Sequence, residues 1–161
     1  YNFNSQPFIE DKQSIQQGYL SSEPYAIKKT AGFEPVIHLL ADYGYDAYAS
    51  TIETALSTIE NRPEIVKLFI EASRKGWISF LEGDPKLAFE LIKKLNPDMP
   101  YDKLIYARKM MINFNIVKTE GTKIGSMTDE HWENFYKKSK NLGIYNQDLE
   151  YKKAYTLEFS N

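Results

Sequence analysis

Acidic and aromatic residues come together twice in the first third of the chain. The segment QQGYLSSEPY at 16–25 holds a carboxylate, two tyrosines and two serines around one glycine, and LLADYGYDAY at 39–48 repeats this combination. Carboxylates accept hydrogen bonds from amines and ring N–H groups, and tyrosine rings offer flat faces for stacking. The two segments are therefore candidates for a site that binds a planar, amino-bearing molecule.

A purely structural interpretation also accounts for both segments. Glu23 would stabilise a helix N-terminus through the helix dipole, and Asp42 would form a turn with Gly44. The tyrosines would bury their rings while their hydroxyl groups reach water. Residue types alone leave the two interpretations open.

Short extended runs and one helix are predicted around these segments. The patterning of strands occurs in three runs, SIQQGYL, PVIHLLADYG and YASTIETAL. Between the first two, SEPYAIKKTAG predicts a helix, which Ser21 or Ser22 would cap and Gly32 would end. Strand, helix, strand is the signature of a parallel sheet, in which ligands bind where strand ends and helix N-termini open into a cleft. The sequence therefore predicts an α/β arrangement before residue 60, with both segments at the cleft.

After residue 60 the pattern is helical. Amphipathic spacing after a proline or a polar cap predicts helices in RPEIVKLFIEASRKGWISFLEG, DPKLAFELIKKL, PYDKLIYARKMMINF and DEHWENFYKKSKNLG. Thr128 would cap the last of these. Trp77 and Trp132 lie at helical spacing, so we expect both in the core.

Composition argues against several classes of function. The 161 residues carry 20 Lys and Arg against 22 Asp and Glu, which gives a formal net charge of −2 and no basic surface for nucleic acid. The chain has no cysteine, which removes disulfides and thiol chemistry from this chain and leaves its compartment open. Because it begins at Tyr1 and shows no signal peptide or long apolar stretch, we expect a processed or truncated product.

The histidines, glycines and serines form no catalytic or metal-binding motif. His38 lies in an apolar extended run and His131 in the first turn of a helix, without metal-ligand spacing between them, so structural roles are expected for both. The glycines make no phosphate-binding fingerprint, and GYLSS lacks the spacing of a nucleophile elbow. We therefore expect no catalytic residue, no metal and no cofactor.

Four segments between about Pro7 and Asn161 carry a family resemblance: GYLSSEPYAIKKTAGFEPVIHLLADYGYDAY, TIET, RPEIVKLFIEASRKGW and YKKAYTLEFSN. They resemble the C-terminal half of the periplasmic substrate-binding proteins of bacterial ABC importers, in the class for nitrate, taurine and the pyrimidine precursor of thiamine. The resemblance implies a type II periplasmic-binding-protein-like α/β fold. This chain would hold its C-terminal segment only, predominantly helical after residue 60.

The resemblance also assigns parts and site residues. Residues 1–49 would be the βαβ end of the second lobe, 50–56 the return crossover and 57–161 the helical C-terminal part of the first lobe. We expect the chain to self-associate, because surface that the N-terminal half covers in the family would be exposed. Cleft-facing loops of the family fall on ten positions of this sequence: Gln17, Gly18, Tyr19, Ser22, Glu23, Tyr25, Asp42, Tyr43, Gly44 and Tyr45.

The function that the resemblance implies is that of a solute receptor without enzymatic activity. It would be periplasmic, or extracytoplasmic and lipoprotein-anchored, and would deliver a small-molecule ligand to an ABC-transporter permease. Anionic ligands are usually met by arginine, and Arg62, Arg74 and Arg108 all lie in the helical half. The acidic and aromatic segments instead favour a planar amino-heterocycle, the thiamine pyrimidine precursor first and a flavin-like solute second.

Three alternatives stay open. The family resembles the fungal pyrimidine synthases of thiamine biosynthesis, which are enzymes with a cysteine-rich run and a catalytic histidine, whereas this chain has no cysteine. A receptor for nitrate, taurine or sulfonate is the second alternative. A signalling or scaffold module that uses the same lobe without transport is the third.

Overall fold

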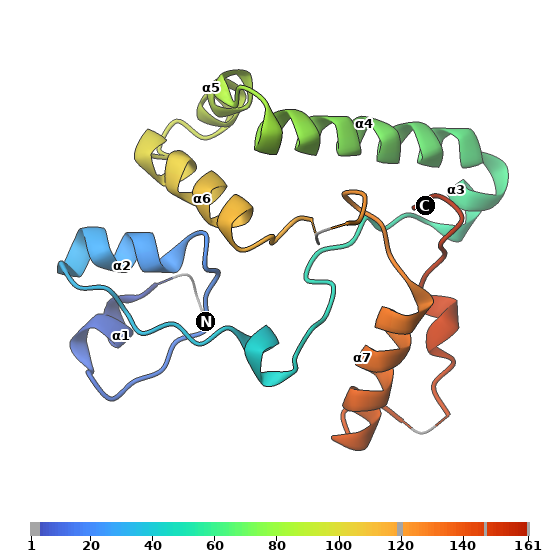
Figure 1. The fold of residues 1–161 in the computed structure, drawn as a ribbon, viewed down its shortest axis with the longest axis horizontal. Helices are drawn as coiled ribbons and strands as arrows, with labels where there is room; N and C mark the ends of the chain where they lie inside the picture. Colours follow the sequence, from blue (N-terminus) through green and yellow to red (C-terminus); the bar gives the residue numbers. More distant parts are fainter. Residues whose placement is uncertain (1–3, 119–120, 147, 161) are drawn as a thin grey trace. The chain divides into compact units, whose positions relative to one another are not determined.

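The structure, a computed structural model, describes residues 4–118, 121–146 and 148–160. These residues form helices and irregular segments and no β-strand (Figure 1). The helices are α1 (Gln6–Glu10), α2 (Glu23–Ala31), η1 (Leu40–Tyr43), α3 (Leu56–Asn61), α4 (Pro63–Glu82), α5 (Lys86–Leu95), α6 (Tyr101–Asn113), α7 (Asp129–Asn141) and η2 (Tyr151–Ala154), where η marks a 3-10 helix.

The predicted α/β fold, with its βαβ unit and type II periplasmic-binding-protein-like sheet, is wrong for this part of the chain. The three runs expected as strands are irregular over 14–19, 34–39 and 45–55, and two of them pass into helices at η1 and α3. A strand is stable only where a neighbouring strand pairs with its N–H and C=O groups. The extended runs have the composition of strands, but no such pairing forms among the described residues.

The five helices that local signals predicted are present, whereas α1, η1, α3 and η2 were not predicted. α2 ends at Gly32, whose φ of 75° places it in the left-handed region that favours glycine and whose N–H bonds the Lys28 carbonyl. The hydroxyl of Thr128 accepts a hydrogen bond from the backbone N–H of His131 at 3.2 Å and so caps α7. The helices predicted after residue 60 are confirmed as α4, α5, α6 and α7.

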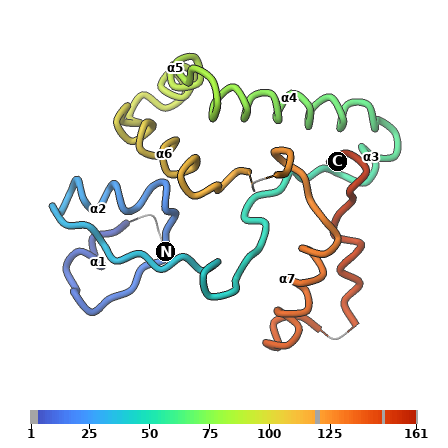
Figure 2. The backbone as a smooth tube through the Cα atoms, in the orientation of Figure 1, coloured from blue at the N-terminus to red at the C-terminus, as the bar shows by residue number. Residues whose placement is uncertain are grey.

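The chain divides into two compact units, and each unit is built from two stretches of sequence. Unit 1 comprises Tyr1–Ile37 and Ile78–Val117, and unit 2 comprises His38–Trp77 and Lys118–Asn161. Figure 2 shows the course of the backbone through these stretches. The three parts at 1–49, 50–56 and 57–161 that the resemblance implies have other boundaries and stay a prediction.

Unit 1 has a small aromatic core where α5 packs against α6. Phe89 of α5 is 2% exposed, and its ring meets Phe80 and Tyr101 edge to face at centroid distances of 5.8 and 5.3 Å. Ile27 of α2 and Leu104 of α6 are also buried. The ring contacts of this core join the C-terminal end of α4 to α5 and to the start of α6.

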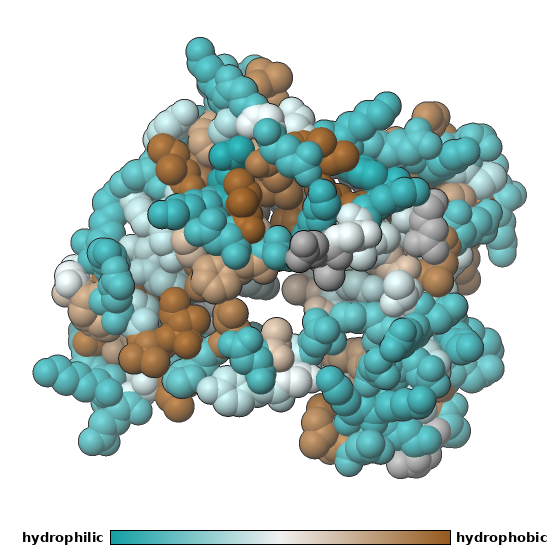
Figure 3. Space-filling view, viewed as in Figure 1, coloured by the Kyte–Doolittle hydropathy of each residue, from teal (hydrophilic) through white to brown (hydrophobic). Residues whose placement is uncertain are grey.

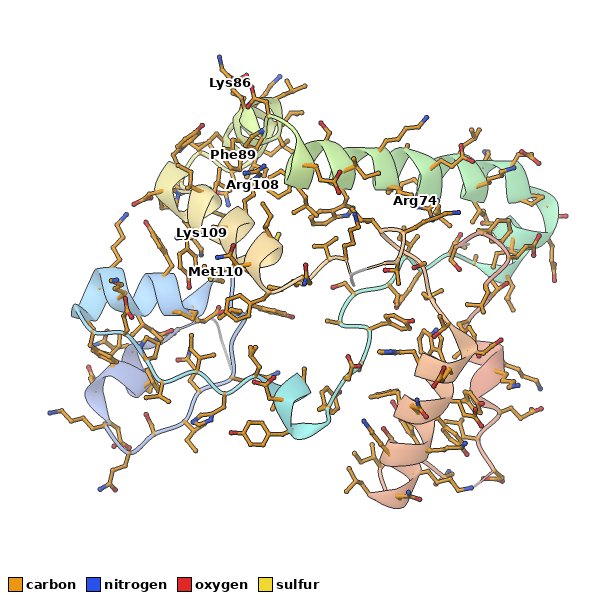
Figure 4. All side chains as sticks on the ribbon, viewed as in Figure 1. Arg74, Lys86, Phe89, Arg108, Lys109 and Met110 are labelled. Atoms are coloured by element: carbon orange, nitrogen blue, oxygen red, sulfur yellow. The ribbon has the colours of Figure 1, made fainter. Side chains whose placement is uncertain are left out.

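Arg108 of α6 binds the C-terminal end of α4 within unit 1. Its Nε donates to the Phe80 carbonyl at 2.7 Å, and its Nη2 donates to the carbonyls of Leu81 and Gly83 at 2.9 and 3.2 Å. The last carbonyls of a helix have no partner inside the helix, and the negative end of the helix dipole attracts a cation. Figure 4 labels Arg108 beside this end of α4.

Arg74 makes the corresponding bonds in unit 2. Its Nε donates to the Ile124 carbonyl at 2.8 Å and its Nη2 donates to the Ser160 carbonyl at 2.9 Å (Figure 4). The side chains of Ile124 and Ser160 are buried, so these carbonyls need such donors. Trp77, one helical turn further along α4, is 39% exposed, and the prediction that it lies in the core is wrong.

Large apolar side chains remain exposed on several helices. Leu87, Leu91 and Leu95 follow one another at every fourth position of α5 and are 70%, 51% and 81% exposed. Figure 3 shows apolar side chains among hydrophilic ones on the visible face. None of the helices in the described ranges is long and apolar enough to cross a membrane.

We expect Arg108→Met to lower the free energy of unfolding by about 1 to 3 kcal/mol, because partly buried carbonyls lose a charged donor. Urea unfolding monitored by far-UV circular dichroism measures this change. Arg62→Met at an exposed position is the matched control and should leave stability within about 0.5 kcal/mol. An equal effect of the two substitutions would contradict the capping role of Arg108.

We expect the chain to self-associate through its exposed apolar side chains, and Leu87→Gln with Leu91→Gln to weaken this association. Size-exclusion chromatography with light scattering measures the molar mass over a dilution series. Lys86→Gln, a polar change on the same helix, is the control. If the unchanged chain is a monodisperse monomer throughout the series, the expectation is wrong.

Candidate functional site

The first acidic and aromatic segment folds around Glu23 at the N-terminus of α2. Glu23 is 8% exposed, and its Oε2 accepts a hydrogen bond from the backbone N–H of Tyr19 at 2.6 Å. A Cβ at Gly18 would lie 2.9 Å from the Glu23 Cγ, so glycine allows this close approach. The structure thus brings Gly18, Tyr19 and Glu23 together around a buried carboxylate.

Tyr25 of the same segment belongs to a charged cluster on the surface of unit 1. Lys29 Nζ donates to the Tyr25 hydroxyl at 3.0 Å and to Asp102 Oδ2 at 2.8 Å. The Tyr25 ring also lies 5.4 Å from the ring of Tyr106. The hydrogen bond from Lys29 lowers the pKa of Asp102 to about 2, so this carboxylate stays charged through the physiological range.

The second segment forms a turn on the surface of unit 2. η1 ends at Gly44, whose φ of 86° is in the left-handed region and whose carbonyl accepts a hydrogen bond from Lys138 Nζ at 2.7 Å. Asp42 is exposed, and the Tyr43 hydroxyl lies 3.0 Å from His38 Nδ1. The position of Asp42 in a turn with Gly44 is the one that the structural interpretation predicted.

The ten predicted site residues divide between the two units. Gly18, Tyr19 and Glu23 are brought together, whereas Tyr25 is engaged with Lys29, and Gln17 is exposed. Because each unit is described by itself, a common cleft for all ten residues stays a prediction. Unit 1 holds Gln17, Gly18, Tyr19, Ser22, Glu23 and Tyr25, and unit 2 holds Asp42, Tyr43, Gly44 and Tyr45.

Tyr45 contributes to a pocket that sequence reasoning did not find. The pocket has a volume of about 90 Å³ and lies between the segment after η1 and the N-terminal half of α7. We call it the aromatic pocket, and its lining residues are Tyr45, Ala47, Tyr48, His131, Trp132 and Phe135.

Ring contacts build the walls of the aromatic pocket. The Tyr48 ring lies 4.2 Å from the His131 ring and 5.5 Å from the Trp132 ring, and Tyr45 meets Phe135 edge to face at 5.9 Å. The Tyr48 hydroxyl accepts a hydrogen bond from the backbone N–H at position 128 at 3.0 Å, which joins this segment to the start of α7. The aromatic rings are thus held by packing and by a backbone contact.

Two ring nitrogens in the wall are unusual. His131 Nε2 and Trp132 Nε1 are buried and have no hydrogen-bond partner among the described residues. Leaving a buried polar group unpaired costs about 1 to 3 kcal/mol. The other nitrogen of the histidine, Nδ1, lies 3.9 Å from Asp46 Oδ2.

Sequence reasoning assigned His131 a structural role and placed Trp132 in the core. Trp132 is partly buried and its ring stacks on that of Tyr155 at 4.8 Å. One sequence signal pointed to the aromatic pocket: His131 and Phe135 are four residues apart, which puts both on one face of α7. Their neighbours Tyr45 and Tyr48 come from a distant segment, so the pocket itself has no local signature.

The structure offers no cluster for a metal ion in the residues it describes. No group of three or more histidine, cysteine, aspartate or glutamate side chains there has the arrangement of a metal site.

Comparison with known proteins places the chain in a family of binding proteins. A family described as NMT1/THI5 like matches residues 1–88 of the 161, and the chain belongs to this family. It is the family of nitrate, taurine and thiamine-precursor periplasmic binding proteins, which confirms the resemblance seen in the sequence. Its members are typically ligand-binding proteins that work with ABC permeases and are usually extracytoplasmic. No curated protein and no solved structure matches the chain.

We expect the carboxyl group of Asp102 to titrate with a pKa of about 2 and Lys29→Met to return it towards 3.8. The pKa of Asp102 is lower in the folded chain than in the unfolded chain, where it is 3.8. The Lys29–Asp102 pair therefore stabilises unit 1 at pH values above 3.8, and this contribution disappears as the pH falls towards 2. Carboxyl-carbon NMR over an acid titration gives the midpoint.

Lys28→Met is the control for this titration, because Lys28 pairs with Glu34 instead of Asp102. It should leave the Asp102 midpoint in place. The Lys29–Asp102 pair is exposed, so we also expect salt to raise the midpoint. A midpoint near 3.8 in the unchanged chain would contradict the contact.

Proposed function

We propose that this chain is the ligand-binding part of an extracytoplasmic solute receptor that captures a small planar amino-heterocycle, such as the pyrimidine precursor of thiamine. It delivers this ligand to the permease of an ABC importer and catalyses no reaction. Membership of the NMT1/THI5-like family supports the receptor class. All ten predicted site residues lie inside the matched range 1–88.

One observation carries the choice of ligand. Arg74 and Arg108 direct their guanidinium groups to backbone carbonyl oxygens, so both are engaged in holding the fold. Guanidinium groups are the side chains best suited to bind nitrate, carboxylate or sulfonate in a bidentate manner. Their engagement favours an amine-bearing ligand over the small anions of the same family.

The acidic and aromatic segments supply the complementary chemistry. The buried carboxylate of Glu23 accepts the N–H of Tyr19, and a carboxylate is the type of acceptor that an amine of a ligand would bond. The exposed ring of Tyr19 beside it offers a flat face for a heterocycle. A pyrimidine-synthase-like enzyme is the alternative, and the absence of cysteine from the 161 residues is the observation against it.

We expect the chain to be stabilised against heat by an aminopyrimidine and not by nitrate, taurine or alkyl sulfonates, because bound ligand stabilises only the folded state. A thermal-shift screen of these compounds, with riboflavin added, makes the comparison. Stabilisation by the small anions alone would overturn the choice of ligand.

We expect Glu23→Gln to weaken aminopyrimidine binding about 30-fold, because a buried charge-assisted hydrogen bond is lost. Isothermal titration calorimetry of the two proteins gives the ratio, and Glu90→Gln at an exposed position on α5 is the matched control. If Glu23 serves only the helix N-terminus, the change will cost about 0.3 to 1 kcal/mol of stability and leave the affinity as it was.

A further inference from the structure

The unpaired nitrogens of the aromatic pocket define what would complete it. The indole Nε1 of Trp132 is always a donor, so its missing partner must be a hydrogen-bond acceptor. His131, the neighbouring lining residue, also has a buried nitrogen, Nε2, that lacks a partner in the described part of the chain. A group that serves both atoms would recover the cost of two unpaired buried groups at once.

The role of His131 Nε2 follows from the charge next to the ring. The carboxylate of Asp46, 3.9 Å from Nδ1, favours a proton on Nδ1. In the neutral ring Nε2 is then the acceptor, so its missing partner is a donor. The pocket wall therefore presents a donor at Trp132 beside an acceptor at His131.

The size and the other walls of the pocket limit the occupant to a small planar group. A volume of about 90 Å³ equals the liquid volume of about three water molecules. Whole ligands of drug size occupy pockets of about 300 to 1,000 Å³. The rings of Tyr48 and Phe135 favour a flat apolar face over a hydrated ion.

We propose that the aromatic pocket is a binding subsite for one small planar group that carries a hydrogen-bond acceptor beside a donor, as an amino-substituted ring nitrogen or an amide does. The acceptor takes the N–H of Trp132 and the donor bonds His131 Nε2. Both nitrogens are closed to solvent in this structure, so binding of the group requires the neighbouring aromatic rings to shift. The subsite rests on the proposed function only for the choice of an aminopyrimidine as probe.

Fluorescence of a chain with a single tryptophan tests this subsite directly. Trp77→Phe leaves Trp132 as the remaining tryptophan of the sequence, so emission reports on the aromatic pocket alone. We expect 4-aminopyrimidine, which has a ring nitrogen beside an amine, to change this emission in a saturable manner. Pyrimidine, which keeps the acceptor and lacks the donor, should bind about tenfold more weakly.

Substitutions then separate the subsite from the site at Glu23. Trp132→Phe keeps an aromatic ring and removes the donor, and it should weaken 4-aminopyrimidine about tenfold in calorimetry, whereas Trp77→Phe should not. Asp46→Asn, an exposed change that does not threaten folding, should reduce the preference for 4-aminopyrimidine over pyrimidine.

The outcomes distinguish the subsite from the proposed function. The subsite is overturned if Trp132→Phe leaves the affinity for 4-aminopyrimidine unchanged and Asp46→Asn leaves the preference for 4-aminopyrimidine over pyrimidine unchanged. If Glu23→Gln then weakens the binding of 4-aminopyrimidine, the proposed function still stands. If Trp132→Phe weakens the binding of 4-aminopyrimidine and Glu23→Gln does not, the result supports the subsite and removes Glu23 from the ligand site. Failure of 4-aminopyrimidine to bind the unchanged chain overturns both.

Discussion

Backbone carbonyl groups must find hydrogen-bond partners without a β-sheet in residues 4–118, 121–146 and 148–160, and this constraint governs the structure. Helices pair most of their own polar groups, but the last turn of each helix leaves carbonyls without partners. In unit 1 the guanidinium group of Arg108 bonds the carbonyls of Phe80, Leu81 and Gly83 at the C-terminal end of α4. In unit 2 the guanidinium group of Arg74 bonds two carbonyls that lie in separate loops. Two of the three arginines, which could have served an anionic ligand, are therefore part of the scaffold.

Local signals were sufficient to predict α2 and α4 to α7, but not the short helices α1, η1, α3 and η2 or the absence of pairing between distant segments in the described residues. Pro63, Gly32 and the Thr128 cap act within one or two turns, and the structure places helix ends beside each of them. Strand formation depends on a partner elsewhere in the chain, and the run PVIHLLADYG turns into η1 because no partner pairs with it in the described ranges. The same contrast of local and distant contacts explains why the fold class was wrong while the longer helices were predicted correctly.

The candidate site shows the same division. The sequence indicated Glu23 and its neighbours because acid, glycine and tyrosine follow one another, and the structure brings Gly18, Tyr19 and Glu23 together. The carboxylate lies in the first turn of α2 and accepts the N–H of Tyr19, while its role in ligand binding stays a prediction. The aromatic pocket could not be predicted, since Tyr48 and Trp132 meet only after folding, and part of its wall lies beyond the range that matches the family.

The stack of Trp132 on Tyr155 has a spectroscopic consequence of its own. The two rings lie nearly parallel, with an angle of 5° between their planes and 4.8 Å between their centroids. Aromatic ring currents shield protons that lie above the face of a neighbouring ring, so resonances of Tyr155 move upfield only while the C-terminal segment rests on α7. A one-dimensional proton spectrum thus contains an internal marker of the folded state of unit 2.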